Sequence, residues 1–147
     1  MLRGIDRKIS PELIKLLMEM GHGDELVLGD GNFPAASHAQ RLVRADGHGV
    51  VAMLDAILPL FPLDYAVDFS AVVMKYRGEK EPAVWSKYRA HLQKYPDGDK
   101  LFIMLPKPEF YERAGRAYAV ITTGEQEGFA NIIIRKGIIK AENHENR

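Results

Sequence analysis

His22 and Asp30 are the first residues whose types and spacing point to chemistry. They lie at the two ends of a short apolar run in residues 19–37, EMGHGDELVLGDGNFPAAS. An imidazole exchanges protons near neutral pH, and Gly21 and Gly23 leave this one unshielded. Asp30 comes just after a predicted strand, at the carboxyl end where α/β folds bind ligands. The two residues would share a pocket within one chain or with the help of a neighbouring subunit. The alternative is that His22 caps helix carbonyls and that Asp30 forms an Asx turn.

Three further residues are candidates for a ligand site. Lys107 lies between two prolines in LPKPEF, which hold it extended just before a predicted helix. A helix N-terminus disfavours cations, which favours a functional role for this lysine; the alternative is an ordinary loop lysine in solvent. Tyr111 follows one turn later and suits either the core or a site. Asn131 begins a buried apolar strand, so its amide needs a partner, either a ligand hydroxyl or a turn carbonyl.

Several other functions are excluded by the same inspection. GHGDEL follows a helix, whereas a dinucleotide-binding loop follows a strand, and GEQEGFANIII lacks the Lys-Ser/Thr of a phosphate loop. The histidines and carboxylates show no metal-ligand spacing, so no metal is expected. The chain has no cysteine, which excludes thiolate catalysis. Lys plus Arg equals Asp plus Glu at 20 each, so neither nucleic acid nor an anionic membrane is expected as a partner, and self-association is easy.

Strands that alternate with helices must position these residues. The patterns predict helices over residues 10–20, 49–60, 109–116 and from 82, and strands over 25–28, 41–44, 71–76, 101–105, 117–123 and 131–139. The apolar run LFIML at 101–105 predicts a strand covered on both faces. These elements form a single α/β domain with a mixed sheet over residues 1–140, followed by a solvated tail over 141–147. There is no signal-peptide pattern and no apolar run long enough to span a membrane, so a cytoplasmic protein is expected.

Four motifs, taken in order, resemble one family. MGHGDE, VRADG, FYERAGRAYAVITTGE and ANIIIRKG resemble the RbsD/FucU family of ribose pyranases and fucose mutarotases, and they are closer to the fucose branch. The resemblance runs to about residue 137. It implies a three-layer α/β/α fold with a mixed central sheet and no cofactor. It also implies a monosaccharide substrate and a homo-oligomer, often a ring-shaped decamer, with sites near subunit boundaries.

The resemblance also implies roles for individual residues. His22 matches the catalytic histidine and Asp30 the sugar-binding aspartate. The other sugar contacts are matched by Lys107, Tyr111, Phe129, Ala130 and Asn131. Phe129 replaces the usual tyrosine, and Lys107 replaces an arginine of the fucose branch or a histidine of the ribose branch. A lysine is a point charge rather than a bidentate donor, so these two differences affect which sugar is bound more than which reaction occurs.

The function that follows is cofactor-independent mutarotation of a free sugar, with L-fucose as the expected substrate. One group takes the proton of the anomeric hydroxyl and another protonates the ring oxygen, and an imidazole suits this because its unperturbed pKa is about 6.5. Two alternatives remain open: a D-ribose pyranase, and a non-catalytic sugar-binding protein on the same fold. A metal-dependent hydrolase is a more distant one.

Overall fold

The computed structural model describes residues 1–141, so most of the predicted tail lies outside the described residues. The order of elements is α1 (Pro11–Glu19), β1 (Glu25–Gly29), α2 (Ala35–His38), β2 (Leu42–Ala45), α3 (Val50–Ile57), the 3-10 helix η1 (Leu58–Leu60), β3 (Phe69–Met74), α4 (Val84–Leu92), β4 (Leu101–Leu105), α5 (Lys107–Arg116), β5 (Ala119–Thr123) and β6 (Ile132–Arg135). No described helix is long and apolar enough to cross a membrane.

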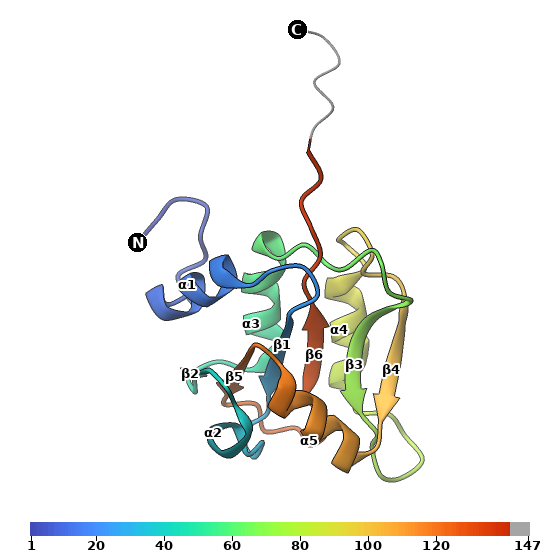
Figure 1. Ribbon diagram of the computed structural model, residues 1–147. Helices are drawn as coiled ribbons and strands as arrows, with labels where there is room; N and C mark the ends of the chain where they lie inside the picture. Colours follow the sequence, from blue (N-terminus) through green and yellow to red (C-terminus); the bar gives the residue numbers. More distant parts are fainter. Residues whose placement is uncertain (142–147) are drawn as a thin grey trace, which may run out of the picture.

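The six strands form one mixed sheet in the order β2-β5-β1-β6-β3-β4. β1 pairs with β5 in parallel and with β6 in antiparallel orientation. β6 also runs antiparallel to β3, whereas β3 and β4 are parallel. All strands except β6 therefore end at the same edge of the sheet, which is the lower edge in Figure 1. We call this the carboxyl edge and the opposite one the amino edge.

Helices cover both faces of this sheet, which confirms the predicted three-layer α/β/α fold (Figure 1). Helices α1, α3 and α4 pack on one face, where Leu26 and Leu28 of β1 join the larger apolar core. Helices α2 and α5 lie over the other face, where Val27 packs with Phe110. Successive residues of β1 face opposite cores, so an unbroken apolar run is what a strand in this position requires.

Helix α1 begins as its sequence predicts. The Ser10 hydroxyl oxygen accepts a hydrogen bond from the backbone N–H of Leu13 at 3.1 Å, and proline occupies the first helical position. Its end does not use a left-handed glycine, because Met20 is the C-cap in an extended conformation and Gly21 has no positive φ. The left-handed residue is Gly23, with φ 87°, which turns the chain from His22 into β1.

Strand β4 lies at the edge of the sheet, so the prediction that both its faces are covered was wrong. Leu101 is 62% exposed and Met104 is 52% exposed. A continuous apolar run is also what an edge strand shows when another surface covers it, and the pattern alone does not distinguish the two cases. Helix α5 begins at Lys107, two residues before the predicted start, and the four-residue helix α2 was not predicted.

Candidate functional site

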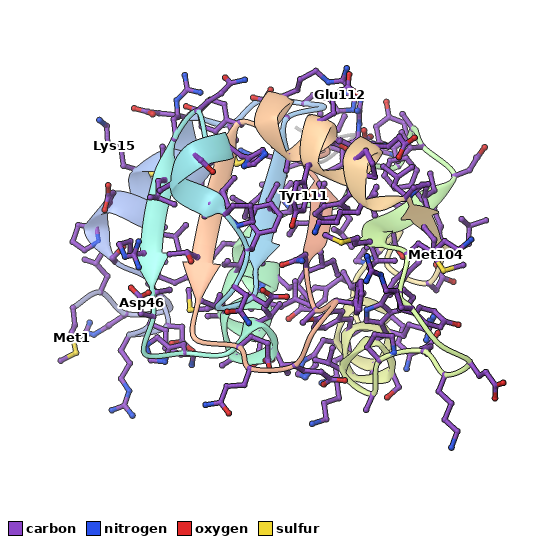
Figure 2. The ribbon with its side chains drawn as sticks, turned by 90° about the horizontal axis from the view of Figure 1, so that it is seen from below. Met1, Lys15, Asp46, Met104, Tyr111 and Glu112 are labelled. Atoms are coloured by element: carbon purple, nitrogen blue, oxygen red, sulfur yellow. The ribbon has the colours of Figure 1, made fainter. Side chains whose placement is uncertain are left out.

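The carboxyl edge holds a cavity of about 540 Å³, a volume in the range of small-molecule sites. Five of the seven predicted site residues line it: Asp30, Lys107, Tyr111, Phe129 and Asn131. Asp30 follows β1, Lys107 and Tyr111 belong to α5, and the other two precede β6. Figure 2 views the molecule from this edge and shows Tyr111 beneath α5, near the centre of the face. The antiparallel strand β6 starts where its neighbours end, which brings Asn131 to Asp30.

Asp30 is buried, with 6% of its surface exposed. Its Oδ1 accepts a hydrogen bond from the backbone N–H of Asn32 at 3.0 Å, so the predicted Asx turn is present. Burial raises the pKa of the Asp30 carboxyl, although backbone N–H donors, including that of Asn32, oppose the rise. The turn and the ligand site are therefore compatible, because one carboxylate holds the loop and still faces the cavity.

Asn131 connects the two sides of the site. Its Oδ1 accepts a hydrogen bond from the backbone N–H of Asp30 at 2.8 Å, so part of its amide is satisfied by a turn. Asn131 is buried, with 4% of the residue surface exposed. Its Nδ2 makes no hydrogen bond within residues 1–141. The free Nδ2 therefore remains as a donor for a hydroxyl group in the cavity.

Helix α4 holds the loop that precedes Asn131. The Trp85 Nε1–H donates to the carbonyl oxygen of Phe129 at 2.9 Å, and the Tyr88 hydroxyl donates to the carbonyl oxygen of Ala130 at 2.6 Å. Phe129 is left-handed, with φ 55°, a conformation that a non-glycine residue keeps only when its surroundings enforce it. Burial raises the pKa of the Tyr88 hydroxyl, which keeps it protonated and donating.

Ala130 does not line the cavity. It is completely buried and takes part through its backbone carbonyl. Trp85 and Tyr88 are buried in the core, and their hydrogen bonds to the loop are a contribution that the sequence pattern did not indicate. A helical stripe of aromatic residues predicts packing, but it does not predict which carbonyl groups the polar atoms of these side chains will reach.

Lys107 and Tyr111 contact each other at the start of α5. The Lys107 Nζ lies 5.4 Å from the centroid of the Tyr111 ring, within the range of a cation–π interaction. The Tyr111 ring meets Phe33 edge-on, with 5.4 Å between ring centroids. The aromatic contact orients Tyr111, and Lys107 is one of the cations of the cavity wall, together with Lys75 and Arg77.

His22 lies at the amino edge, away from this cavity. β1 spans Glu25–Gly29 between His22 and Asp30, and a strand rises about 3.3 Å per residue, so one chain does not bring the two side chains together. The His22 Nε2 lies 2.9 Å from Oδ1 of Asp64. His22 does not cap helix α1, because the Lys136 ammonium donates instead to the carbonyl oxygens of Leu17 at 2.9 Å and Met20 at 2.5 Å.

The structure adds residues that the sequence analysis did not select. Tyr76 and Arg77 follow β3 and line the cavity. Asp64 contacts His22, and Arg135 donates to Asp64. Tyr76 and Arg77 could have been selected from the sequence, because ligand sites in α/β folds lie just after the strands. Asp64 had no such signal, because it is far from His22 in the sequence. Within residues 1–141, no three His, Cys, Asp or Glu side chains form a group suited to a metal ion.

A mixed sheet with helices on both faces, and with a cavity at its carboxyl edge that carries polar and charged side chains, is typical of an α/β protein that binds a small molecule. Comparison with known proteins identifies the family. Residues 3–139 match the model of the RbsD / FucU transport protein family, and the chain belongs to this family. It is 44% identical over 140 residues to an L-fucose mutarotase of Actinobacillus pleuropneumoniae, covering 94% of this chain and 97% of that protein. It is 43% identical to the fucose mutarotase of Homo sapiens, covering 94% of each chain.

A solved structure extends this similarity to three dimensions. The crystal structure of the fucose mutarotase from Streptococcus pneumoniae in complex with L-fucose has a TM-score of 0.88 to this chain and 44% sequence identity. The alignment covers 95% of this chain and all of that one, 100%. The whole domain is therefore shared with a protein that binds L-fucose.

Proposed function

We propose that this protein is a sugar mutarotase that interconverts the anomers of L-fucose. The observation that carries the proposal is the cavity at the carboxyl edge, where Asp30, Asn131 and Lys107 meet in a fold shared with relatives named fucose mutarotases. A carboxylate, an amide and an ammonium group together accept from and donate to the hydroxyl groups of an aldose. Because mutarotation opens and recloses a ring C–O bond by proton transfers and leaves the oxidation state of the sugar unchanged, the proposed reaction requires no metal and no redox cofactor.

In the proposed reaction the imidazole of His22 takes the proton of the anomeric hydroxyl. The ring C–O bond then breaks, the aldehyde forms, and the ring oxygen takes a proton from a water molecule, whose hydroxide is neutralised by the imidazolium of His22. Closing on the other face of the carbonyl reverses both transfers. Asp30 and Asn131 hold the ring orientation, and the Lys107 ammonium stabilises negative charge as it develops on oxygen. Proton transfer of this kind contributes roughly 10²–10⁴-fold, which suffices for a reaction that already occurs in water.

Because His22 lies at the amino edge, the proposal requires a second copy of the chain. His22 of the partner subunit would complete the cavity of this one. The surface near His22 supports this arrangement: it carries the exposed apolar residues Met18 (79%), Ile139 (85%) and Ile138 (41%). Apolar groups gathered on one face are typical of an interface. The proposal therefore includes a homo-oligomer, a decamer by resemblance to the family, and a cytoplasmic location.

The test is saturation-transfer NMR of anomer exchange, with L-fucose and D-ribose compared at equal concentration. The wild-type protein should accelerate exchange of L-fucose, and His22→Ala should abolish the acceleration without changing the size of the oligomer. His48→Ala is the matched control, because it removes the same group from a loop that does not contact the cavity. Full activity of His22→Ala would remove His22 from the mechanism.

Two results would favour the alternatives. Faster exchange of D-ribose than of L-fucose would favour a pyranase. Tight binding of a sugar without any change in its exchange rate would favour a non-catalytic binding protein, an alternative prompted by Phe129 and Lys107, which replace the tyrosine and the arginine expected from the family resemblance.

A further inference from the structure

Two cations of the cavity have no role in the proposed reaction. Lys75 and Arg77 follow β3 and line the cavity together with Lys107, and both are exposed. Neither side chain makes an ion pair or a hydrogen bond within residues 1–141, whereas the arginines of α4 and α5 each pair with a carboxylate: Arg89, Arg113 and Arg116. The planar donor group of Arg77 is therefore available to a ligand of the cavity.

Backbone contacts fix the place of these two cations. The Lys75 N–H donates to the carbonyl oxygen of Leu105 at 2.7 Å. Leu105 ends β4, so Lys75 lies beside the residues that lead into α5. Between the two cations, the Tyr76 ring packs edge-on against Trp85 of α4, with 5.3 Å between ring centroids. Strands β3 and β4 end side by side at the carboxyl edge (Figure 1), so all three cations of the cavity gather at this end of it.

Acidic groups lie at the other end of the cavity. The strand order places β6 between β1 and β3, with β4 outermost. Asp30 follows β1, and the Gly31 N–H next to it donates to the carbonyl oxygen of Glu125 at 2.8 Å. Asn131 precedes β6, between the acidic and the basic end. Like charges that gather without an anion repel one another, so a negatively charged ligand would stabilise the basic end.

The spacing of the strands sets the size of such a ligand. Neighbouring strands lie about 4.8 Å apart, so the end of β3 is about 5 Å beyond Asn131 and about 10 Å beyond Asp30 across the sheet. One hexose covers this range, because its ring hydroxyl groups reach the carboxylate and the amide while the substituent of carbon 5 points to the cations. In L-fucose this substituent is a methyl group, which makes no use of a positive charge.

We propose that Lys75 and Arg77 form a carboxylate subsite, and that the cavity accepts hexuronic acids as a second class of substrate. In these sugars the carbon outside the ring is a carboxylate. The inference rests on the proposed mutarotation at this cavity, because it names further substrates of the same reaction. The Arg77 guanidinium donates to both carboxylate oxygens, and Lys75 adds a point charge. A carboxylate bonded directly to the ring stays within one strand spacing of Asn131, whereas a phosphate ester carries its charge two bonds farther out.

The test compares three sugars that differ only at carbon 6: D-galactose, D-galacturonate and D-galactose 6-phosphate. Saturation-transfer NMR gives the KM of the wild-type protein for anomer exchange of each sugar at low salt. We expect the KM for D-galacturonate to be lower than that for D-galactose by about tenfold or more, which is the effect of one charge-assisted hydrogen bond. High salt should reduce this preference, because the two cations are exposed.

Arg77→Gln should remove most of the difference between the two KM values, and Lys75→Gln should remove less of it. The ratio of the KM values is the readout, so a general loss of activity does not imitate the effect. Lys80→Gln is the matched control, because it removes a positive charge from the same exposed segment at a residue that does not line the cavity. It should leave the ratio unchanged.

Equal KM values for D-galactose and D-galacturonate in the wild-type protein would overturn the inference, and so would an Arg77→Gln protein that keeps the preference. If Arg77→Gln does not fold, the wild-type comparison decides. A stronger preference for D-galactose 6-phosphate would contradict the assignment to hexuronic acids. A smaller oligomer in Arg77→Gln would assign the guanidinium to a contact between copies and would also overturn the inference.

The failure of the proposed function has a different signature. In that case the protein would not accelerate exchange of L-fucose or of any other sugar tested. The subsite is then decided by calorimetry of D-galacturonate and D-galactose binding to the wild-type protein and to Arg77→Gln. Tighter binding of the acid that depends on Arg77 would support the subsite, and equal binding of the two sugars would overturn it.

Discussion

Asp64 is a residue on which both the surroundings of His22 and the stability of the fold depend. Its carboxylate is ionised in the folded protein at any pH above about 2. It lies in the segment Pro62–Asp64, whose backbone is hydrogen-bonded to the end of β6. A buried charge is tolerated only where its partners are complete, and here the partners are an arginine, a backbone N–H and the imidazole of His22. Asp64 is the buried member of this cluster, so loss of a partner, or protonation of the carboxylate itself, is expected to destabilise the folded protein.

At the residue scale we predict a pH-dependent contribution of Asp64 to stability. Its pKa is lowered from 3.8 to about 2 on folding, so the unfolded chain binds the proton more tightly. The contribution, about 2 kcal/mol, is fully present above pH 5 and is lost as the pH falls through about 4 to 2. The measurement is urea unfolding of the wild-type protein and Asp64→Asn across this range.

The difference in unfolding free energy between the two proteins should shrink on acidification. Asp46→Asn is the control, because it disrupts an exposed ion pair with Arg44, which contributes little. A difference that stays constant between about pH 5 and pH 2 would mean that Asp64 is not stabilised in its ionised form by folding.

At the scale of elements, the site depends on how α4 is placed against the loop before β6. The loop carries Phe129 in a left-handed conformation, and its two carbonyl groups are bound by Trp85 and Tyr88 from one helical face. Through Asn131 the same loop reaches the backbone of Asp30. A helix on one face of the sheet thus determines the shape of a cavity at its edge.

We predict that Tyr88→Phe damages both stability and sugar binding. The change leaves the buried carbonyl of Ala130 without a partner, which costs about 1–3 kcal/mol, and it frees the loop that holds Asn131. Urea unfolding should show the loss of stability, and the KM for L-fucose should rise more than kcat falls. Tyr118→Phe, which removes an exposed hydrogen bond to Glu19, should change neither quantity appreciably.

The order of elements was largely predictable from the sequence, and its exceptions have physical reasons. Buried runs such as Leu26–Leu28 and Ile132–Ile134 identify strands, and Ser10-Pro11 identifies a helix start. The exposed edge position of β4 was not predictable, since an apolar strand reads the same whether a helix or another subunit covers it. Asp30 and Asn131 were selected from local sequence, whereas Asp64 depends on a contact 42 residues away from His22, which no local pattern encodes.

At the scale of the whole molecule, the proposed site is divided between copies of the chain. The cavity side, with Asp30 and Asn131, lies at the carboxyl edge, and the proton-transfer side, with His22, lies at the amino edge. The sheet separates them, so no small movement within one chain joins them. The net charge is zero, with 20 basic and 20 acidic residues, so electrostatic repulsion between copies is small.

Mixing two inactive variants tests this division directly. His22→Ala lacks the proton carrier but has an intact cavity, whereas Asp30→Asn keeps His22 but has a damaged cavity. If sites form between copies, an assembly refolded from equal amounts of both should recover about a quarter of the wild-type exchange rate, because random neighbours join an intact cavity to an intact His22 at that frequency. If each site lies within one chain, every site keeps a defect and nothing is recovered.

Refolded mixtures of Asp30→Asn and Asn131→Ala are the control, since both defects fall on the cavity side and leave no intact pairing. Native mass spectrometry of the mixtures confirms that hybrid assemblies have formed, so an inactive hybrid of His22→Ala and Asp30→Asn would contradict the shared site.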